Sequence, residues 1–329
     1  MTSIFVFVAV QIFADFNAPY DALDSACLLT NKMEVDELLN HLVVLSKKFK
    51  KNDLKVVDRL ISDLKLISNA NKEVQNKILR QINEILVETN KDDENIKDDR
   101  FKDIDTKMKR LESFFGQDSF YTILLKIRIM SYKATASKDG ISYNEFEIMK
   151  KSCIKSFGLE SILGSELYVV LCMTNNRMRE WSELKKNAEI SLEIKTKLGI
   201  NGDRIITPVS FLIKSNVMMG NYRDAIKNKD KLESYFLEET DTLNLRPQLR
   251  IFSSLATAYT KLDKITNAIA MQEMAVAAAC EIFKSDSPQA KEQALVLREL
   301  LAKSKEFTFM RNLEDRFKLQ PLPLQNGEK

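Results

Sequence analysis

Three short stretches of this chain resemble one another and recur at a nearly constant spacing: Arg179–Leu184, Gly220–Ile226 and Asp263–Ile269. Leu184, Ala225 and Ala268 hold the same position in the three copies, so the period is 41 and then 43 residues. Each copy combines a turn with the start of an amphipathic segment. Because one helical hairpin cannot bury its apolar face alone, copies are expected to stack and to expose a long groove. The pattern therefore favours a binding protein over a catalyst.

Apolar residues on both sides of each turn follow the helical period. In the last copy, Phe252, Leu255, Ala256 and Tyr259 precede the turn, and Ile265, Ala268, Gln272 and Ala275 follow it. Steps of three and four residues mark one buried face of a helix. Trp181 and Tyr222 align within the turns and are expected to pack in the core. The alternative is an irregular helical bundle in which this spacing is a coincidence.

The repeated turn resembles the tetratricopeptide repeat over residues 162–305. The common form of that repeat is about 34 residues long. A period near 42 is more similar to the units of kinesin light chains and clustered-mitochondria proteins, which often carry a Leu-Gly-x-x-His-Pro-like connector. Lys197–Asp203 and Phe283–Ala290 stand in that place without the histidine, and Glu238–Leu245 lacks the pattern. The resemblance implies an all-α fold, a right-handed superhelical array of helical hairpins (a TPR-like solenoid).

Composition agrees with a helical chain and disfavours several classes of function. Eight Gly and six Pro in 329 residues are too few for a fold with frequent β-turns. Fifty basic and 47 acidic residues give a net charge of only +3, unlike the dense basic patch of a nucleic-acid-binding protein. The four cysteines form no Cys-x-x-Cys pair, and His41 is the single histidine, so neither a zinc site nor a catalytic His41 is expected. No phosphate-binding glycine-rich loop is present, and no cofactor is expected.

The N-terminal segment, residues 1–30, leaves the cellular location open. Its apolar run at residues 4–13 is too short for a membrane span, which needs about 20 residues, but it suits the core of a secretory signal. No Lys or Arg precedes the run, and no Asn-x-Ser/Thr acceptor occurs in the chain. A cytoplasmic protein with no stable membrane span is expected, and secretion after removal of residues 1–14 is the alternative.

The rest of the chain is divided by patterning into N-terminal helices, a repeat array and a tail. Residues 31–100 contain three amphipathic helices within 34–90, and a highly charged link follows at 90–105. Residues 101–315 hold helices at about 105–115, 118–135 and 143–157, then the repeats, and finally one long capping helix at about 287–315. Residues 316–329 form a tail that is expected to be disordered.

Residues 138–146 imitate part of a calcium-binding loop. With Glu145 as the last ligand, Ala134, Ala136 and Lys138 fall where oxygen ligands are needed, so calcium binding is disfavoured. Ser142 and Glu145 instead predict the start of a helix with a capping box.

The resemblance also implies a binding surface, because the first helix of each tetratricopeptide-like hairpin lines the concave face. Carrying the inward positions onto this sequence gives Glu166, Met173, Asn176 and Arg177 from the first copy, Thr207, Ser210 and Lys214 from the second, and Arg250, Ser253, Thr257, Thr260 and Lys261 from the third. The set holds four cations and one anion. It predicts a protein-interaction adaptor that binds an acidic peptide or partner helix through charge-assisted hydrogen bonds. A secreted helical effector or carrier is the alternative, and an enzyme the less favoured one.

Overall fold

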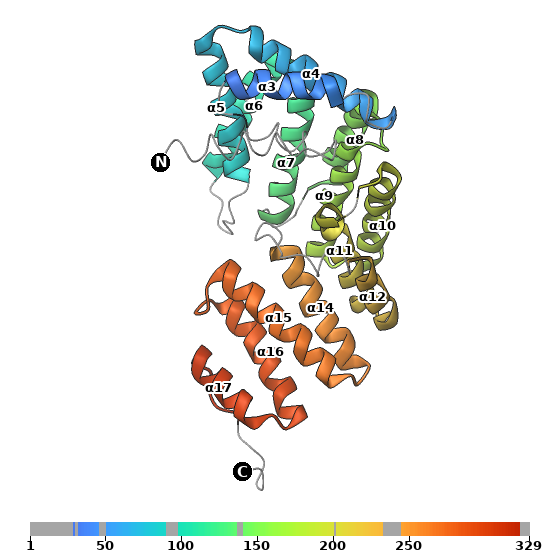
Figure 1. The fold of residues 1–329 in the computed structure, drawn as a ribbon, viewed down its shortest axis with the longest axis vertical. Helices are drawn as coiled ribbons and strands as arrows, with labels where there is room; N and C mark the ends of the chain where they lie inside the picture. The colour runs from blue at the N-terminus through green and yellow to red at the C-terminus, as the bar shows by residue number, and fades with distance from the viewer. Residues whose placement is uncertain are drawn as a thin grey trace. The chain divides into compact units, whose positions relative to one another are not determined.

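A computed structural model describes residues 29, 32–45, 51–89, 98–136, 141–200, 202–232 and 245–322. These residues form fourteen α-helices and two short 3₁₀ segments, which confirms the predicted all-α class (Figure 1). The chain divides into two compact units, Met1–Met178 with Glu193–Leu198, and Arg179–Leu192 with Gly199–Lys329. Most helices pack against their neighbours in the sequence. Residues 4–13 lie outside the described residues.

Among the residues that the structure describes, the first unit contains seven complete helices and the end of an eighth. They are α3 (Lys32–Leu45), α4 (Lys51–Asn69), α5 (Lys72–Thr89), α6 (Asp98–Phe115), α7 (Phe120–Ala136), α8 (Tyr143–Phe157), α9 (Ile162–Met178) and part of α10 (Trp181–Leu198). Helix α7 packs against α4, α5, α6, α8 and α9, and is therefore central. Its Phe120, Tyr121 and Ile123 are at most 2% exposed, because a helix surrounded by others is apolar on nearly every face.

The second unit is a chain of successive helix contacts. After the start of α10 come α11 (Ile206–Met218), α12 (Tyr222–Lys229), α14 (Leu245–Lys261), α15 (Ile265–Phe283), α16 (Pro288–Ser304) and α17 (Phe307–Phe317). Helix α11 packs on α12 and α14, α14 on α15, α15 on α16, and α16 on α17. Ala256, Ala268 and Ala275 are almost completely buried, and these small side chains allow α14 and α15 to approach closely.

The three predicted turns lie where the sequence placed them, between the end of one helix and the start of the next. Each contains one residue with left-handed backbone: Arg179 (φ 60°), Gly220 (φ 80°) and Asp263 (φ 58°). The following N–H groups of Asn221 and Lys264 donate back to the carbonyls of Asn216 and Tyr259, at 2.8 and 2.9 Å. This geometry ends a helix by satisfying its last carbonyl groups.

A fourth turn of this kind breaks the segment that was predicted to be one capping helix. Lys305 has left-handed backbone (φ 64°), and the N–H of Glu306 donates to the carbonyl of Leu301 at 2.9 Å. The prediction of a single helix over 287–315 was therefore wrong, and α16 and α17 form another hairpin. Lys305 lies 42 residues after Asp263, which is the same period. Met310 is fully buried and takes the position that Ala268 holds in the preceding copy.

The connectors that precede three helices also share one geometry. Gly116, Gly158 and Lys284 have positive φ, and each is followed three residues later by a serine. Ser119, Ser161 and Ser287 cap α7, α9 and α16, since their Oγ atoms accept the N–H groups of Thr122, Gly164 and Ala290 at 3.1–3.2 Å. Gly116 and Gly158 are 42 residues apart, and Lys284 follows Gly158 by 126 residues, three such periods.

A repeated ion pair supports the same periodicity inside the first unit. The connector carboxylate Asp118 contacts Lys155 at 2.7 Å, and its counterpart Glu160 contacts Lys197 at 2.9 Å. Both pairs join residues 37 positions apart, so each acid reaches a lysine near the end of the second helix that follows it. The 42-residue period thus extends N-terminally to Gly116, into residues where the sequence analysis found no repeat signature.

The remaining local predictions have mixed outcomes. The three helices expected within 34–90 are confirmed as α3 to α5, and the Ser142–Glu145 capping box is present with both of its hydrogen bonds. Part of the charged link, from Asp98, is the start of α6. Within the described residues, no helix combines the length and apolarity that crossing a membrane requires.

The prediction of a disordered tail from residue 316 was wrong for the start of that segment, because α17 continues to Phe317, whose side chain is buried. The N–H of Leu322 donates to Glu314 Oε1 at 2.7 Å, and Arg298 donates to the carbonyl of Gln320 at 2.8 Å. Residues 323–329 lie outside the described residues, so the disorder expected there stays a prediction.

Candidate functional site

The residues predicted to line the groove fall into both units. Asn176 and Arg177 belong to the first unit, and Thr207, Ser210, Lys214, Arg250, Ser253, Thr257 and Lys261 belong to the second. Arg177 donates a hydrogen bond to the carbonyl oxygen of Thr135. Glu166, the one anion of the set, forms an ion pair with the buried Lys195 at 2.8 Å. In the first unit these side chains therefore contact other parts of the same unit.

In the second unit, a hydrogen bond joins the two helix faces that were predicted to line the groove. Arg250 of α14 donates through Nη1 to Ser210 Oγ of α11 at 2.7 Å. The Arg250 guanidinium also lies over the Phe211 ring, with 4.0 Å between Cζ and the ring centroid. Arginine stacks on aromatic faces because its charge is delocalised and weakly hydrated. Both contacts hold the guanidinium beside α11.

Lys214 lies one turn further along α11, where its amine is largely buried and is affected by the positive charges of Arg250 and Arg179. Its Nζ lies 5.9 Å from the centroid of the Trp181 ring. Burial, and to a smaller degree the charges of Arg250 and Arg179, together lower the pKa of Lys214 to about 8. In the part of the chain that the structure describes, no carboxylate lies within ion-pair distance of this amine. We call Arg179, Lys214 and Arg250, with the rings of Trp181 and Phe211, the cationic cluster.

Three hydroxyl groups of the predicted set donate hydrogen bonds to backbone carbonyl groups of their own helices. Ser210 Oγ donates to the Thr207 carbonyl at 2.7 Å, Ser253 Oγ donates to the Leu249 carbonyl at 2.7 Å, and Thr257 Oγ1 donates to the Ser253 carbonyl at 3.0 Å. Such bonds to a preceding carbonyl are a common arrangement for Ser and Thr in helices. A negative ligand would therefore be bound by the cations first, with the hydroxyl groups along the same faces. Lys261 is exposed at the end of α14.

Three members of the cluster were missed as site residues by sequence reasoning, among them Phe211 of α11. Arg179 was assigned only to a turn, and Trp181 was expected to be a core residue. Trp181 is half-buried and lies beside Lys214. Their proximity to Lys214 depends on how helices pack, for which the local sequence holds no signal.

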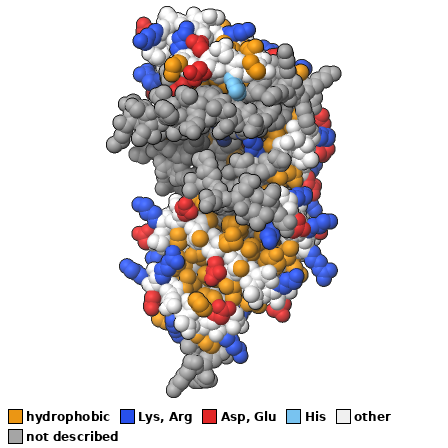
Figure 2. Space-filling view, in the orientation of Figure 1, with side chains coloured by type: hydrophobic (Ala, Val, Ile, Leu, Met, Phe, Trp, Pro, Cys, Tyr) orange, Lys and Arg blue, Asp and Glu red, His pale blue; other side chains and the backbone are white. Residues whose placement is uncertain are grey.

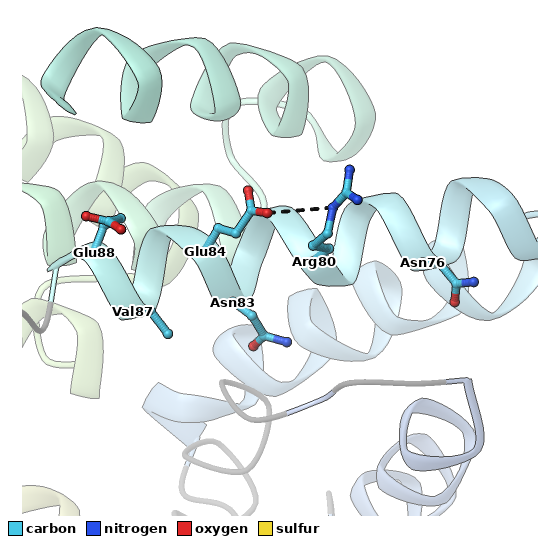
Figure 3. Close-up of a pocket in the computed structure, with 6 residues that line it drawn as sticks. All are labelled: Asn76, Arg80, Asn83, Glu84, Val87 and Glu88. Atoms are coloured by element: carbon cyan, nitrogen blue, oxygen red, sulfur yellow. Dashed lines mark ion pairs between the residues drawn. The ribbon is translucent and has the colours of Figure 1, made fainter. Parts of the chain in front are cut away.

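The first unit contains a different surface feature, a shallow pocket along α5 (Figure 3). Its described lining comes from one helix face, with Asn76, Arg80, Asn83, Glu84, Val87 and Glu88. Arg80 is 3.6 Å from Glu84, and Lys107 is 3.0 Å from the same carboxylate. These charges already balance one another, so this face shows no preference for an anionic or cationic ligand.

Burial shifts the pKa of two titratable groups inside the first unit, Asp63 and Cys153. Burial raises the pKa of Asp63 to about 7, against the opposing effect of donors at the start of α7. Among these donors, the Tyr121 N–H lies 3.0 Å from Asp63 Oδ2. Burial raises the pKa of the Cys153 thiol to about 11, so it stays protonated at neutral pH. Among the described side chains, no group of three or more His, Cys, Asp or Glu could hold a metal ion.

The displayed surface of the second unit is mixed in character. Figure 2 shows hydrophobic side chains gathered over its helices, with acidic and basic side chains interspersed around them. Four large hydrophobic side chains of the second unit are 38–65% exposed: Met274, Leu295, Val296 and Phe309.

Comparison with protein-family models, with curated proteins and with solved structures found no match for the chain.

Proposed function

We propose that this protein is an interaction adaptor, and that its second unit binds an acidic peptide or partner helix along the faces of α11 and α14. The cationic cluster carries this proposal. Three positive groups lie close enough for two of them to lower the pKa of the third. Such crowding costs folding free energy, which the charge of an acidic ligand would offset.

The architecture that we propose for the second unit is a tetratricopeptide-like solenoid. The left-handed residues Arg179, Gly220, Asp263 and Lys305 recur every 41 to 43 residues. Within the unit, the hairpins α11/α12, α14/α15 and α16/α17 contact one another in chain order. Stacked hairpins of this kind expose long surfaces that suit an extended or helical ligand.

The binding mode follows from the order of side chains along α11 and α14. Arg250 is held beside α11 by Phe211 and Ser210, and its positive charge would attract a ligand carboxylate to this face. Lys214 adds a second cation on the neighbouring helix, and Lys261 lies at the far end of α14. A ligand with acidic groups spaced along its length would contact these positions in turn, and exposed charges at the edge would mainly set the association rate.

A quantitative capture experiment tests the proposal. The full-length protein and the Lys214→Glu/Arg250→Glu variant would be used to capture partners from a cell extract, followed by direct titration with each captured protein. Loss of binding in the variant is expected. The matched control is Lys227→Glu/Lys303→Glu, which makes the same charge change at exposed positions of α12 and α16. Equal helicity and melting temperature must be established first. Partners that bind all three proteins equally would contradict the assignment of the α11 and α14 faces.

The alternative, a secreted helical effector or carrier, is motivated by the apolar run at residues 4–13. Mass measurement of the protein from its natural source decides between cytoplasmic and secreted forms. A chain that starts near Asp15 supports secretion, and one that starts at Met1 or Thr2 contradicts it.

A further inference from the structure

We propose that Arg298, Arg311 and Glu314 form a binding site for an extended, proline-containing segment of a partner protein, and that residues 320–322 of this chain fill the site until the partner segment displaces them. The site lies on α16 and α17, which pack against each other in the second unit (Figure 1). This inference goes beyond the adaptor function proposed for α11 and α14, because it concerns other helices and another kind of ligand. We call the three side chains the peptide clasp.

The chain turns back on itself directly after α17. Lys318 has left-handed backbone (φ 52°), and the N–H of Leu319 donates to the carbonyl of Glu314 at 2.9 Å. The next residues run back along the helix, since Leu322 contacts side chains that lie 8 and 11 positions earlier in the chain. Residues 320–322 are therefore a non-helical segment that lies against α16 and α17.

The hydrogen bonds from the peptide clasp to this segment go to main-chain atoms. Glu314 Oε1 accepts the N–H of Leu322 at 2.7 Å, and Arg311 Nη2 donates to the carbonyl of the same residue at 3.2 Å. Arg298 Nη1 donates to the carbonyl of Gln320 at 2.8 Å. The donor and the acceptor of one residue are thus bound together, as they are when two β-strands pair. Because these bonds involve no side chain of the segment, another extended sequence can form them too.

The peptide clasp is positioned by a bond of its own. Arg311 Nη1 donates to Glu314 Oε2 at 2.6 Å, and the Glu314 side chain is only 3% exposed. A charge-assisted hydrogen bond of this kind fixes the direction of both side chains. It leaves Glu314 Oε1 for a peptide N–H, and a buried carboxylate oxygen without a donor is costly. The site therefore favours an occupant that supplies a main-chain N–H at this point.

The chain's own segment is held with little apolar burial. Gln320 and Pro321 are exposed, and Leu319 and Leu322 are half-buried. Release of such a segment costs far less free energy than unfolding of the unit. In addition, Arg298 Nε is buried and has no hydrogen-bond partner among the described residues. A buried donor without an acceptor costs free energy, so a partner segment that supplies an acceptor there would bind more tightly than the chain's own segment does.

Proline suits the middle position of the ligand. Pro321 has no N–H, and the peptide clasp binds main-chain groups of the residues on either side of it. The proline ring fixes φ near −65° and favours extended backbone, so the segment loses less conformational freedom on binding. We therefore expect a ligand with the pattern apolar-x-Pro-apolar, in which x and the last residue provide the main-chain groups.

Leu322→Pro tests the displacement, because it removes the N–H that Glu314 accepts. The matched control Leu322→Ala keeps that N–H, and both full-length variants must show the helicity and melting temperature of the wild type. The probe is a fluorescently labelled peptide with the sequence of residues 318–324, and fluorescence polarisation gives its affinity. Leu322→Pro should bind the probe at least about tenfold more tightly than the wild type, whose own segment competes at high effective concentration. Leu322→Ala should stay closer to the wild type.

Three further measurements show whether the probe occupies the peptide clasp. A probe with N-methyl leucine at the position of Leu322 lacks the required N–H and should not bind Leu322→Pro. Arg311→Lys/Leu322→Pro keeps a cation beside Glu314 but loses the forked donor, so it should bind the unmodified probe at least about threefold more weakly. In the wild type, saturating probe should speed hydrogen exchange of the Leu322 N–H, because the chain's own segment is released.

The remaining outcomes would overturn the inference. Absence of probe binding to Leu322→Pro, or equal affinity of this variant and the wild type, would show that residues 320–322 are only a fixed extension of α17. Dimerisation of the wild type that the free probe reverses would show that the occupant is the segment of a second copy and not of a partner protein. None of these results bears on the acidic ligand of α11 and α14, which the Lys214→Glu/Arg250→Glu variant tests.

Discussion

Substitutions at the left-handed turn residues of the 42-residue period should change the free energy of unfolding in opposite directions. Replacing the glycine by Ala should lower it, and replacing a non-glycine residue by Gly should raise it. Gly220 tolerates its φ of 80° because it lacks a Cβ, and a Cβ built there would meet no atom within 4 Å. Gly220→Ala therefore tests backbone strain without steric overlap. Left-handed backbone costs an L-residue about 1–2 kcal/mol, and the smaller freedom of Ala in the unfolded chain offsets about 0.5–1 kcal/mol of this. The net destabilisation should be about 1 kcal/mol.

The same reasoning predicts stabilisation at the turns that lack glycine. Asp263 and Lys305 have φ of 58° and 64°, and both side chains are exposed. Lys305→Gly should raise the free energy of unfolding by about 0.5–1 kcal/mol, and Asp263→Gly by less, because Asp tolerates left-handed backbone better than Lys.

Urea unfolding followed by circular dichroism measures this series. With a slope of about 3 kcal/mol per M, 1 kcal/mol moves the midpoint by about 0.3 M. Ala270→Gly, at an exposed position within α15, is the control and should lower stability by about 1 kcal/mol, because there the added backbone freedom brings no relief of strain. If Lys305→Gly lowers the midpoint as this control does, the turn at Lys305 is not left-handed and the fourth hairpin is wrong.

Three further predictions concern the first unit. Gly164→Ala should destabilise it by roughly 1–3 kcal/mol, because the new Cβ would lie 2.0 Å from the carbonyl oxygen of Leu159, and thermal unfolding checks this. Asp63 has a folded pKa raised from 3.8 to about 7, so its contribution to stability is largest below pH 4 and is lost as pH rises through 7. The urea midpoint of Asp63→Asn should therefore rise relative to that of the wild type as pH increases from 5 to 8. A difference between the two midpoints that stays constant with pH would contradict the buried carboxylate. Ser142→Ala removes one side of the capping box and should cost about 1 kcal/mol, measured by the same urea assay at pH 7.

The sequence predicts most helices because their apolar period and capping residues are local. Helix α8 shows this clearly, since Ser142 and Glu145 specify its start within four residues. The connector signature Phe-Gly-x-Asp/Glu-Ser at residues 115–119 and 157–161 is equally local, and it was available in the sequence. The break at Lys305 was not, because lysine carries no preference for left-handed backbone, and only packing of Met310 into the core requires the chain to turn there.

Contacts between helices explain the remaining differences between the sequence-based predictions and the structure. In the sequence, Asp63 is one polar residue of an amphipathic helix. In the structure, its carboxylate accepts a hydrogen bond from the Tyr121 N–H at the start of α7, 58 residues later in the chain. Glu166 reads as a groove residue, yet it pairs with Lys195. In both cases the partner is chosen by tertiary packing, so residue type and spacing predict a helix face without predicting what covers it. The same limit explains why Ser210, Lys214 and Arg250 were selected while Arg179 was not.

Whether the cationic cluster serves binding or folding can be decided from stability itself. A structural cation is destabilising to remove, because its removal leaves a buried partner unpaired. Removal of the Lys214 amine should instead stabilise the folded protein, since burial and two arginines hold its pKa near 8, well below the 10.5 of a free lysine. At pH 7 this depression opposes folding by about 1–3 kcal/mol, and the opposition disappears as pH rises from 8 toward 10.5. Lys214→Met should therefore raise the urea midpoint at pH 7, and this gain should shrink at pH 9.5, while affinity for the anionic ligand falls. A loss of stability in Lys214→Met would show instead that the amine has a structural partner, and would remove the physical basis for a ligand site at this position.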